Sequence, residues 1–307
     1  MSWFYREDNN NKDIVLAAVS RNWNALEYAS DELRNDKDVV LTAINQYGWA
    51  LKYASGELRN DKDVVTAAVS QDGLALQFAS PDLRRDRDIV IKAISQDGRA
   101  LEYASPELKN DRDIVLKAIE NRGDALKYAS YALRNDKDIV LKAISQNDGT
   151  LESASPTLRN DRDVVLKAIN YDPDALWYAS DVLRDNKDIV LKAVEKNGLA
   201  LEYASDELKN NKDIVLKAVE NNGFALGYAS DKLQNDKDVV FNAIETNIGA
   251  IKYASDELQS DKDINAFVES YIESYASGDL QNLWRSGLRF DDIDGDLGDD
   301  DPGDIGD

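Results

Sequence analysis

The sequence predicts an all-α fold, an α-solenoid of ten 25-residue repeats, each a helix, a turn and a short helix, with a cap at each end. Three observations predict it. An aspartate recurs every 25 residues from Asp13 to Asp263 without an insertion. Apolar residues within each repeat follow the spacing of a helix and do not alternate as in a strand. Glycine and capping residues recur at the same positions of the repeat.

Positions within the repeat are numbered here as columns 1 to 25, beginning with the recurrent aspartate, and residues 88–112 serve as the example. Columns 2, 3, 6 and 7 fall on one helical face, and columns 13, 14, 17 and 21 form a second apolar stripe. Column 6 is alanine in all ten full repeats, and columns 17 and 18 are Ala-Ser in all ten. Because one repeat cannot bury its own apolar face, consecutive repeats must stack, and the small alanines allow their backbones to approach closely.

Recurrent polar residues predict where the helices begin and end. Column 24 is Asp or Asn in every copy and suits the N-cap of the first helix, with the column-1 aspartate as an acid in its first turn. Glycine at column 11, as in Gly48 and Gly98, predicts a left-handed C-cap. A second helix is predicted over roughly columns 12–17. Serine at column 18 then caps a third short turn, as in Ser105-Pro106, where proline suits the first helical position.

The ends of the chain depart from the repeat. Trp3, Phe4 and Tyr5 are expected to cover the first repeat, and the loss of the glycine turn after Asp263 favours fusion of two helices into one. The last residues are rich in Asp and Gly, a composition typical of a solvated tail. The predicted parts are, in order, an N-terminal cap at 1–12, a ten-repeat helical solenoid at 13–262, C-terminal capping helices at 263–290 and an acidic Asp/Gly tail at 291–307.

A calcium loop is the alternative interpretation of the tail, because Asp292, Asp294 and Asp296 follow the spacing of calcium ligands. The EF-hand pattern requires glycine at its sixth position and glutamate at its twelfth, where this chain has Leu297 and Gly303. The tail is therefore interpreted as solvated chain, and no metal-binding residue is predicted.

Composition excludes several classes of function. The formal net charge of −22 disfavours nucleic acid as a partner, because phosphate binding requires a basic surface. No apolar stretch is long enough to span a membrane, so no membrane partner is expected. The N-terminus lacks the apolar run of a signal peptide; we expect the protein not to be secreted by the general route, and to be cytoplasmic or part of a larger particle.

The chain contains no histidine and no cysteine, the residues most often used as general bases, nucleophiles and metal ligands. The column-1 aspartates could form a catalytic or cation-binding row, but they adjoin basic residues at column 25 and are expected to serve as helix-start acids. Tyrosine at column 16 and serine at column 18 have no base nearby and are also interpreted as structural. No catalytic residue, cofactor or enzymatic activity is predicted.

The unit A-L-x-Y-A-S-x-E-L-R-N-D-K-D-I-V-L-K-A-I resembles a repeat family catalogued as a domain of unknown function, which occurs in single-celled eukaryotes, large DNA viruses and some bacteria. The resemblance covers residues 13–262, with Y-A-S-x-E-L-R and D-I-V-L-K-A-I in the same order and spacing. It departs locally at Thr150 and Ser153, where Ala and Tyr are usual. The resemblance implies a repeat fold and no established activity, so it supplies no functional residues.

Variable columns are where a repeat scaffold selects its partner. Column 12 holds residues of every kind, and a tryptophan interrupts the charged residues of column 15. Because exposed aromatic and apolar side chains anchor interfaces, five residues are predicted to bind a partner: Trp49, Leu74, Trp177, Leu199 and Phe224. The alternative is that column 12 packs locally against the end of the preceding helix.

These observations favour a non-enzymatic scaffold for protein–protein interaction, whose protein partner the sequence does not identify. The alternative is a structural subunit of a virion, filament or cytoskeletal lattice, because solenoid ends that lack caps can stack by self-assembly or co-assembly. An enzyme is the least favoured interpretation.

Overall fold

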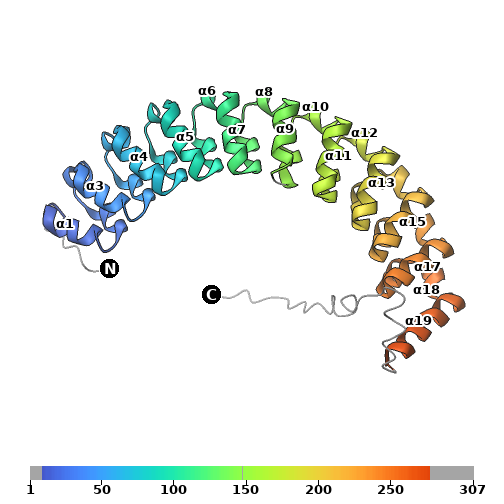
Figure 1. Ribbon diagram of the computed structural model, residues 1–307. Helices are drawn as coiled ribbons and strands as arrows, with labels where there is room; N and C mark the ends of the chain where they lie inside the picture. Colours follow the sequence, from blue (N-terminus) through green and yellow to red (C-terminus); the bar gives the residue numbers. More distant parts are fainter. Residues whose placement is uncertain (1–8, 147, 277–307) are drawn as a thin grey trace. The chain divides into compact units, whose positions relative to one another are not determined.

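The computed structural model describes residues 9–146 and 148–276, and these ranges contain helices and turns without a β-strand. The predicted all-α repeat fold is therefore confirmed. The chain divides into two compact units, Met1–Val164 and Val165–Asp307, which we call the N-terminal and C-terminal units and describe separately. In each unit the long helices follow one another in chain order (Figure 1).

Each repeat consists of a long α-helix, a 3₁₀ helix of six residues and a short third helix. The long helices of the N-terminal unit are α1 (Lys12–Val19), α3 (Lys37–Ile44), α4 (Lys62–Gln71), α5 (Arg87–Gln96), α7 (Arg112–Asn121) and α9 (Lys137–Ile144). The 3₁₀ helices are η1 (Trp23–Tyr28), η2 (Gly48–Tyr53), η4 (Gly73–Phe78), η6 (Gly98–Tyr103), η7 (Gly123–Tyr128) and η8 (Asp148–Ser153). The short helices are α2 (Asp31–Arg34), η3 (Leu58–Asn60), η5 (Leu83–Arg85), α6 (Pro106–Lys109), α8 (Tyr131–Arg134) and α10 (Pro156–Arg159).

The C-terminal unit repeats the same arrangement. Its long helices are α11 (Arg162–Tyr171), whose first residues precede the unit boundary, α13 (Lys187–Lys196), α15 (Lys212–Asn221), α17 (Lys237–Thr246) and α19 (Lys262–Ala276). The 3₁₀ helices are η9 (Pro173–Tyr178), η10 (Gly198–Tyr203), η11 (Gly223–Tyr228) and η12 (Ile248–Tyr253). The short helices are α12 (Asp181–Arg184), α14 (Asp206–Lys209), α16 (Asp231–Gln234) and α18 (Asp256–Gln259).

The core is the face that each repeat shares with its neighbours. In the example repeat, Ile89, Val90, Ala93 and Ile94 of α5 are buried, as the helical spacing predicts. Long helices pack on the next long helix, α4 on α5 in the N-terminal unit and α13 on α15 in the C-terminal unit. The apolar columns are thus buried by stacking, because the 25-residue unit is too small to enclose them itself.

The predicted N-caps are confirmed. The Asp86 carboxylate accepts hydrogen bonds from the backbone N–H groups of Asp88 and Ile89, at 3.0 and 3.1 Å. The column-18 residue Ser105 caps α6 by accepting from the N–H of Leu108. The long helix begins at column 25, directly after its cap, and the basic side chain of that column therefore lies in its first turn.

The prediction for the column-11 glycine was wrong. Gly98 does not end α5 in a left-handed conformation; it is buried and begins η6, so the second helix is a 3₁₀ helix over columns 11–16. A Cβ at Gly98 would lie 2.4 Å from the carbonyl oxygen of Ala118 in the next repeat. Glycine is required there because the backbones of two repeats touch, not because of its conformational freedom.

The described part of the C-terminal end supports fusion of the last helices, since α19 has 15 residues against 10 in α17. The predicted N-terminal aromatic cap, the remainder of the C-terminal cap and the acidic tail lie outside the described residues. No helix in the described ranges has both the length and the apolar character needed to cross a membrane.

We expect Gly73→Ala to lower the free energy of unfolding in urea by about 1–3 kcal/mol, the usual cost of forcing an added methyl group into a packed interior. Its Cβ would lie 2.2 Å from the Ala93 carbonyl oxygen. Gly56→Ala is the matched control, because no atom lies within 4 Å of its added Cβ. Equal stability of the two variants would contradict the close contact.

Candidate functional site

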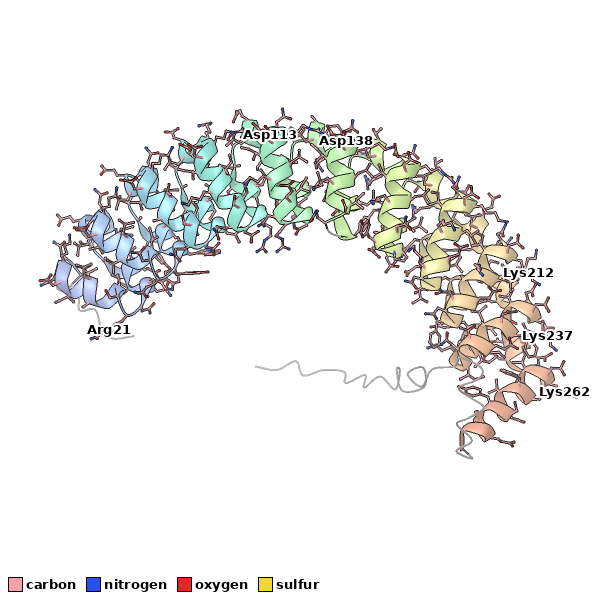
Figure 2. All side chains as sticks on the ribbon, viewed as in Figure 1. Arg21, Asp113, Asp138, Lys212, Lys237 and Lys262 are labelled. Atoms are coloured by element: carbon pink, nitrogen blue, oxygen red, sulfur yellow. The ribbon has the colours of Figure 1, made fainter. Side chains whose placement is uncertain are left out.

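The column-1 aspartates form a ladder of ion pairs between repeats. The basic residue in the first turn of one long helix reaches the acids at the start of the next long helix, which are two where column 24 is aspartate and one where it is asparagine, as for Lys187 and Asp213. Lys37 Nζ lies 2.8 Å from Asp61 Oδ2 and 3.0 Å from Asp63 Oδ2. In the C-terminal unit Lys212, Lys237 and Lys262 follow one another along one edge, as Asp113 and Asp138 do in the N-terminal unit (Figure 2).

The electrostatics of the ladder are those of a structural element. The hydrogen bond from Lys62 lowers the pKa of Asp86 more than burial raises it, and the N–H of Ile89 contributes in the same direction. The guanidinium of Arg87 likewise lowers the pKa of Asp111. A carboxylate that acts as a general acid at neutral pH requires the opposite shift. Within the described ranges, no group of three or more acidic side chains is arranged to hold a metal ion.

The column-18 serine links neighbouring repeats. The Ser130 hydroxyl accepts from the N–H of Leu133 and donates to Asn110 Oδ1 of the preceding repeat at 2.6 Å. Its backbone N–H donates to the Lys109 carbonyl oxygen at 2.9 Å. One serine thus caps the short helix and joins it to the previous repeat, which accounts for its recurrence without a chemical role.

The opposite end of each repeat carries the variable residues. We call the surface formed by columns 8–12, 15 and 16, at the C-terminal end of the long helix and along the 3₁₀ helix, the 3₁₀ edge. Trp49 is half-buried there, with its ring edge-on to Phe78 at 5.6 Å and its Nε1 donating to Asp72 at 2.7 Å. Phe224 meets Tyr253 in the same way at 6.4 Å. The column-12 rings of Trp49 and Phe224 therefore pack on the column-16 ring of the following repeat, and Trp49 also stacks on Tyr47, just beyond the end of the preceding helix α3.

The five predicted partner-binding residues do not share one environment. Trp49, Leu74, Leu199 and Phe224 are half-buried at column 12, whereas Trp177 at column 15 is 57% exposed. Trp49 and Leu74 lie along the 3₁₀ edge of the N-terminal unit, and Trp177, Leu199 and Phe224 lie along that of the C-terminal unit. Their binding role stays a prediction.

An aromatic cluster in the first repeats was not identified from the sequence. Trp23 and Tyr47 have ring centroids 4.9 Å apart, and Tyr47 stacks on Trp49 at 6.1 Å. Trp23 also meets Tyr53 at 6.2 Å. Both missed residues occupy columns 10 and 11, which were interpreted as turn positions. Aromatic residues in columns that mostly hold glycine and small polar residues were the available signal.

A second aromatic pair lies in the C-terminal unit. Trp177 meets Tyr203 edge-on at 5.6 Å. Burial raises the pKa of the Tyr203 phenol, and the charges of Asp174 and Glu202 raise it further. Asp174 also accepts a hydrogen bond from Asn197 Nδ2 at 3.1 Å. Exposed aromatic surface and carboxylates therefore occur together at this part of the edge.

This fold, with buried repeated columns and a variable edge, defines the protein as an α-helical repeat protein of the solenoid type. The chain belongs to the family described as a domain of unknown function, DUF4116, which matches it at residues 11–59, 36–84, 86–134, 111–156, 136–184, 186–234 and 236–265. The resemblance of the repeat unit is thereby confirmed. Comparison with curated proteins and with solved structures gave no match.

Acidification is expected to weaken the ladder. The pKa values of Asp86 and Asp111 are lower in the folded chain than their ordinary value of 3.8, so their stabilising contribution is complete above that value. It is lost as the pH falls through the folded-state pKa. We expect the free energy of unfolding in urea to be steady from about pH 7 to about pH 5 and to fall below about pH 4.

The double variant Asp86→Asn, Asp111→Asn tests this cause. Asparagine is a suitable replacement because Asn186 and Asn211 already cap α13 and α15. The variant should retain its helix caps and lose less stability than the native chain between about pH 5 and pH 3. An unchanged loss on acidification would show that these ladder carboxylates are not its source.

Proposed function

We propose that the chain is a non-enzymatic scaffold for protein–protein interaction, whose 3₁₀ edge presents variable residues to a partner polypeptide. The observation that supports it most directly is that the fixed and the variable columns lie in different environments. Fixed columns are buried between repeats or paired in the ladder, whereas the variable columns 12 and 15 lie on the accessible edge. On a repeat scaffold, such positions can differ without loss of the fold.

The chemistry of the side chains supports a binding role over a catalytic one. The chain has no histidine or cysteine. Its most regular carboxylates are engaged by lysine and arginine and have lowered pKa values, as at Asp86 and Asp111. The 3₁₀ edge instead offers aromatic rings, such as Trp49 and Trp177, which are the side chains that most often dominate interface energies.

The proposal predicts that alanine substitution of the five anchor residues reduces recovery of the native partner in affinity purification from the source cells. Removal of an anchor residue typically costs about 1–2 kcal/mol or more, so recovery should fall at least tenfold. The substituted residues are Trp49, Leu74, Trp177, Leu199 and Phe224.

Residues on the opposite edge serve as the control, for example alanine at the exposed Val182 and Tyr131. Circular dichroism must show that both variants retain the helical content of the native chain. Partner recovery that is equal for the anchor variant, the control and the native chain would count against the scaffold.

The alternative is a structural subunit of a larger assembly, and one observation favours it. Ile14 of α1 is 39% exposed, whereas its counterpart Ile89 in an internal repeat is 1% exposed. A second copy or another subunit could cover this face as a preceding repeat would. Concentration-dependent light scattering tests it: a monomer at every concentration, alone and with co-purified proteins, would disfavour assembly.

A further inference from the structure

Trp177 differs from every other residue of its column. The remaining nine repeats have Glu, Lys, Gln or Gly at column 15. The indole is 57% exposed on η9, and its ring meets the Tyr203 ring of the next repeat at 5.6 Å. Large aromatic side chains that stay exposed beside a polar rim are typical of interaction surfaces.

In other repeats, the column-16 tyrosine ring of the 3₁₀ edge binds a lysine side chain of the same chain. Wherever column 15 is lysine, its ammonium lies over the column-16 tyrosine ring of the same repeat. The pairs and their distances to the ring centroid are Lys52–Tyr53 at 5.3 Å, Lys127–Tyr128 at 4.9 Å and Lys252–Tyr253 at 5.1 Å. Attraction between a cation and the negative face of an aromatic ring accounts for this arrangement. In the repeats that carry Trp177 and Glu202, column 15 supplies no lysine for Tyr178 and Tyr203.

Two carboxylates, Asp174 and Glu202, occur in the same two repeats. Asp174 is exposed on η9, where Asn197 of the next repeat holds it at 3.1 Å. Glu202 is exposed at column 15 of η10, next in sequence to Tyr203. Burial raises the pKa of the Tyr203 phenol, and the negative charges of both carboxylates raise it further. The surface combines an indole, a phenol ring and negative charge, which together suit a guanidinium or ammonium group.

Three lysines of the long helices α11 and α13, in the same two repeats, have partners within the chain. Lys167 lies over the Tyr171 ring at 5.2 Å from its centroid. Lys196 donates to the carbonyl oxygen of Asn170 at 3.3 Å. Lys192 pairs with Glu195 at 2.7 Å. Each of the three lysines therefore has a partner other than Trp177.

We propose that the surface formed by Trp177, Tyr203, Asp174 and Glu202 binds a lysine or arginine side chain of a basic partner polypeptide. The inference rests on the proposed scaffold function and specifies the chemistry of the partner. Charge complementarity supports it, because the chain has a formal net charge of −22 and opposite charge promotes both encounter and selection.

The test is a fluorescence-anisotropy titration of the full chain with a labelled peptide of alternating arginine and glycine. The matched probe replaces each arginine with citrulline, which keeps the shape and removes the charge. We expect the arginine peptide to bind and the citrulline peptide to bind markedly less. Trp177→Ala should weaken binding of the arginine peptide about 3- to 30-fold, the range that a cation over an indole contributes.

Two further variants separate the ring from the carboxylate. Trp177→Lys should weaken binding more than Trp177→Ala, because it removes the indole and adds a positive charge that repels the arginine peptide. Asp174→Asn should weaken binding and reduce its dependence on salt, because one screened charge is removed. Val182→Ala is the control: this side chain is 70% exposed in the same repeat, on α12, and its removal should leave binding unchanged.

Equal binding of the two peptides, absence of binding to the native chain, or native affinity in Trp177→Ala would overturn the proposal. So would an equal loss in Val182→Ala. These failures differ from failure of the scaffold function. If the five-residue anchor variant loses the native partner while the arginine peptide binds as tightly to Trp177→Ala as to the native chain, the scaffold stands and the basic-peptide site is wrong.

Discussion

The direct contact between the backbones of neighbouring repeats is the constraint on which the rest of the structure depends. Where column 11 is glycine, as in Gly73 and Gly223, an added Cβ would lie 2.2 Å from the column-6 carbonyl oxygen of the next repeat. The alanine at column 6, such as Ala93, is fully buried at the same junction. At these junctions two small residues therefore set the separation of the repeats, and the larger side chains pack at the distance that they allow.

Polar interactions reinforce this stacking along the other edge. The column-18 serine and the column-25 cation each connect one repeat to its neighbour, as in Ser130 to Asn110 and Lys37 to Asp61. Each exposed ion pair contributes only about 0–1 kcal/mol. The ion pairs matter because they recur at each junction and because they fix the register of neighbouring repeats. Each pair forms only when the next long helix begins level with the first turn of the previous one. The ladder thus adds to a stack that apolar burial already stabilises.

Because the fixed columns are occupied by these contacts, the 3₁₀ edge is one surface on which repeats can differ. The differences have a spatial order within each unit. Trp23, Tyr47 and Trp49 make a continuous aromatic contact in the N-terminal unit. Trp177 and Tyr203 make a separate one beside carboxylates in the C-terminal unit. A solenoid can in this way carry distinct surfaces without a change in its core.

The sequence by itself determined the repeat length, the helical class, the N-caps and the buried columns. Each of these depends on residues close together in the sequence. Asp86 caps the helix that directly follows it, and the adjacent residues Ile89 and Val90 lie on the buried face of that helix. Column 12 was recognised as variable for the same reason. Trp177 was predicted to be an anchor because it interrupts a column of mostly charged residues.

Only the tertiary structure decided which repeat each side chain meets. Gly98 leaves room for the carbonyl oxygen of Ala118, and Trp49 packs on Phe78. In each case the contact crosses a junction between repeats. Such contacts join residues about one repeat apart, and the period of a single repeat contains no information about the angle and distance at which the next one lies.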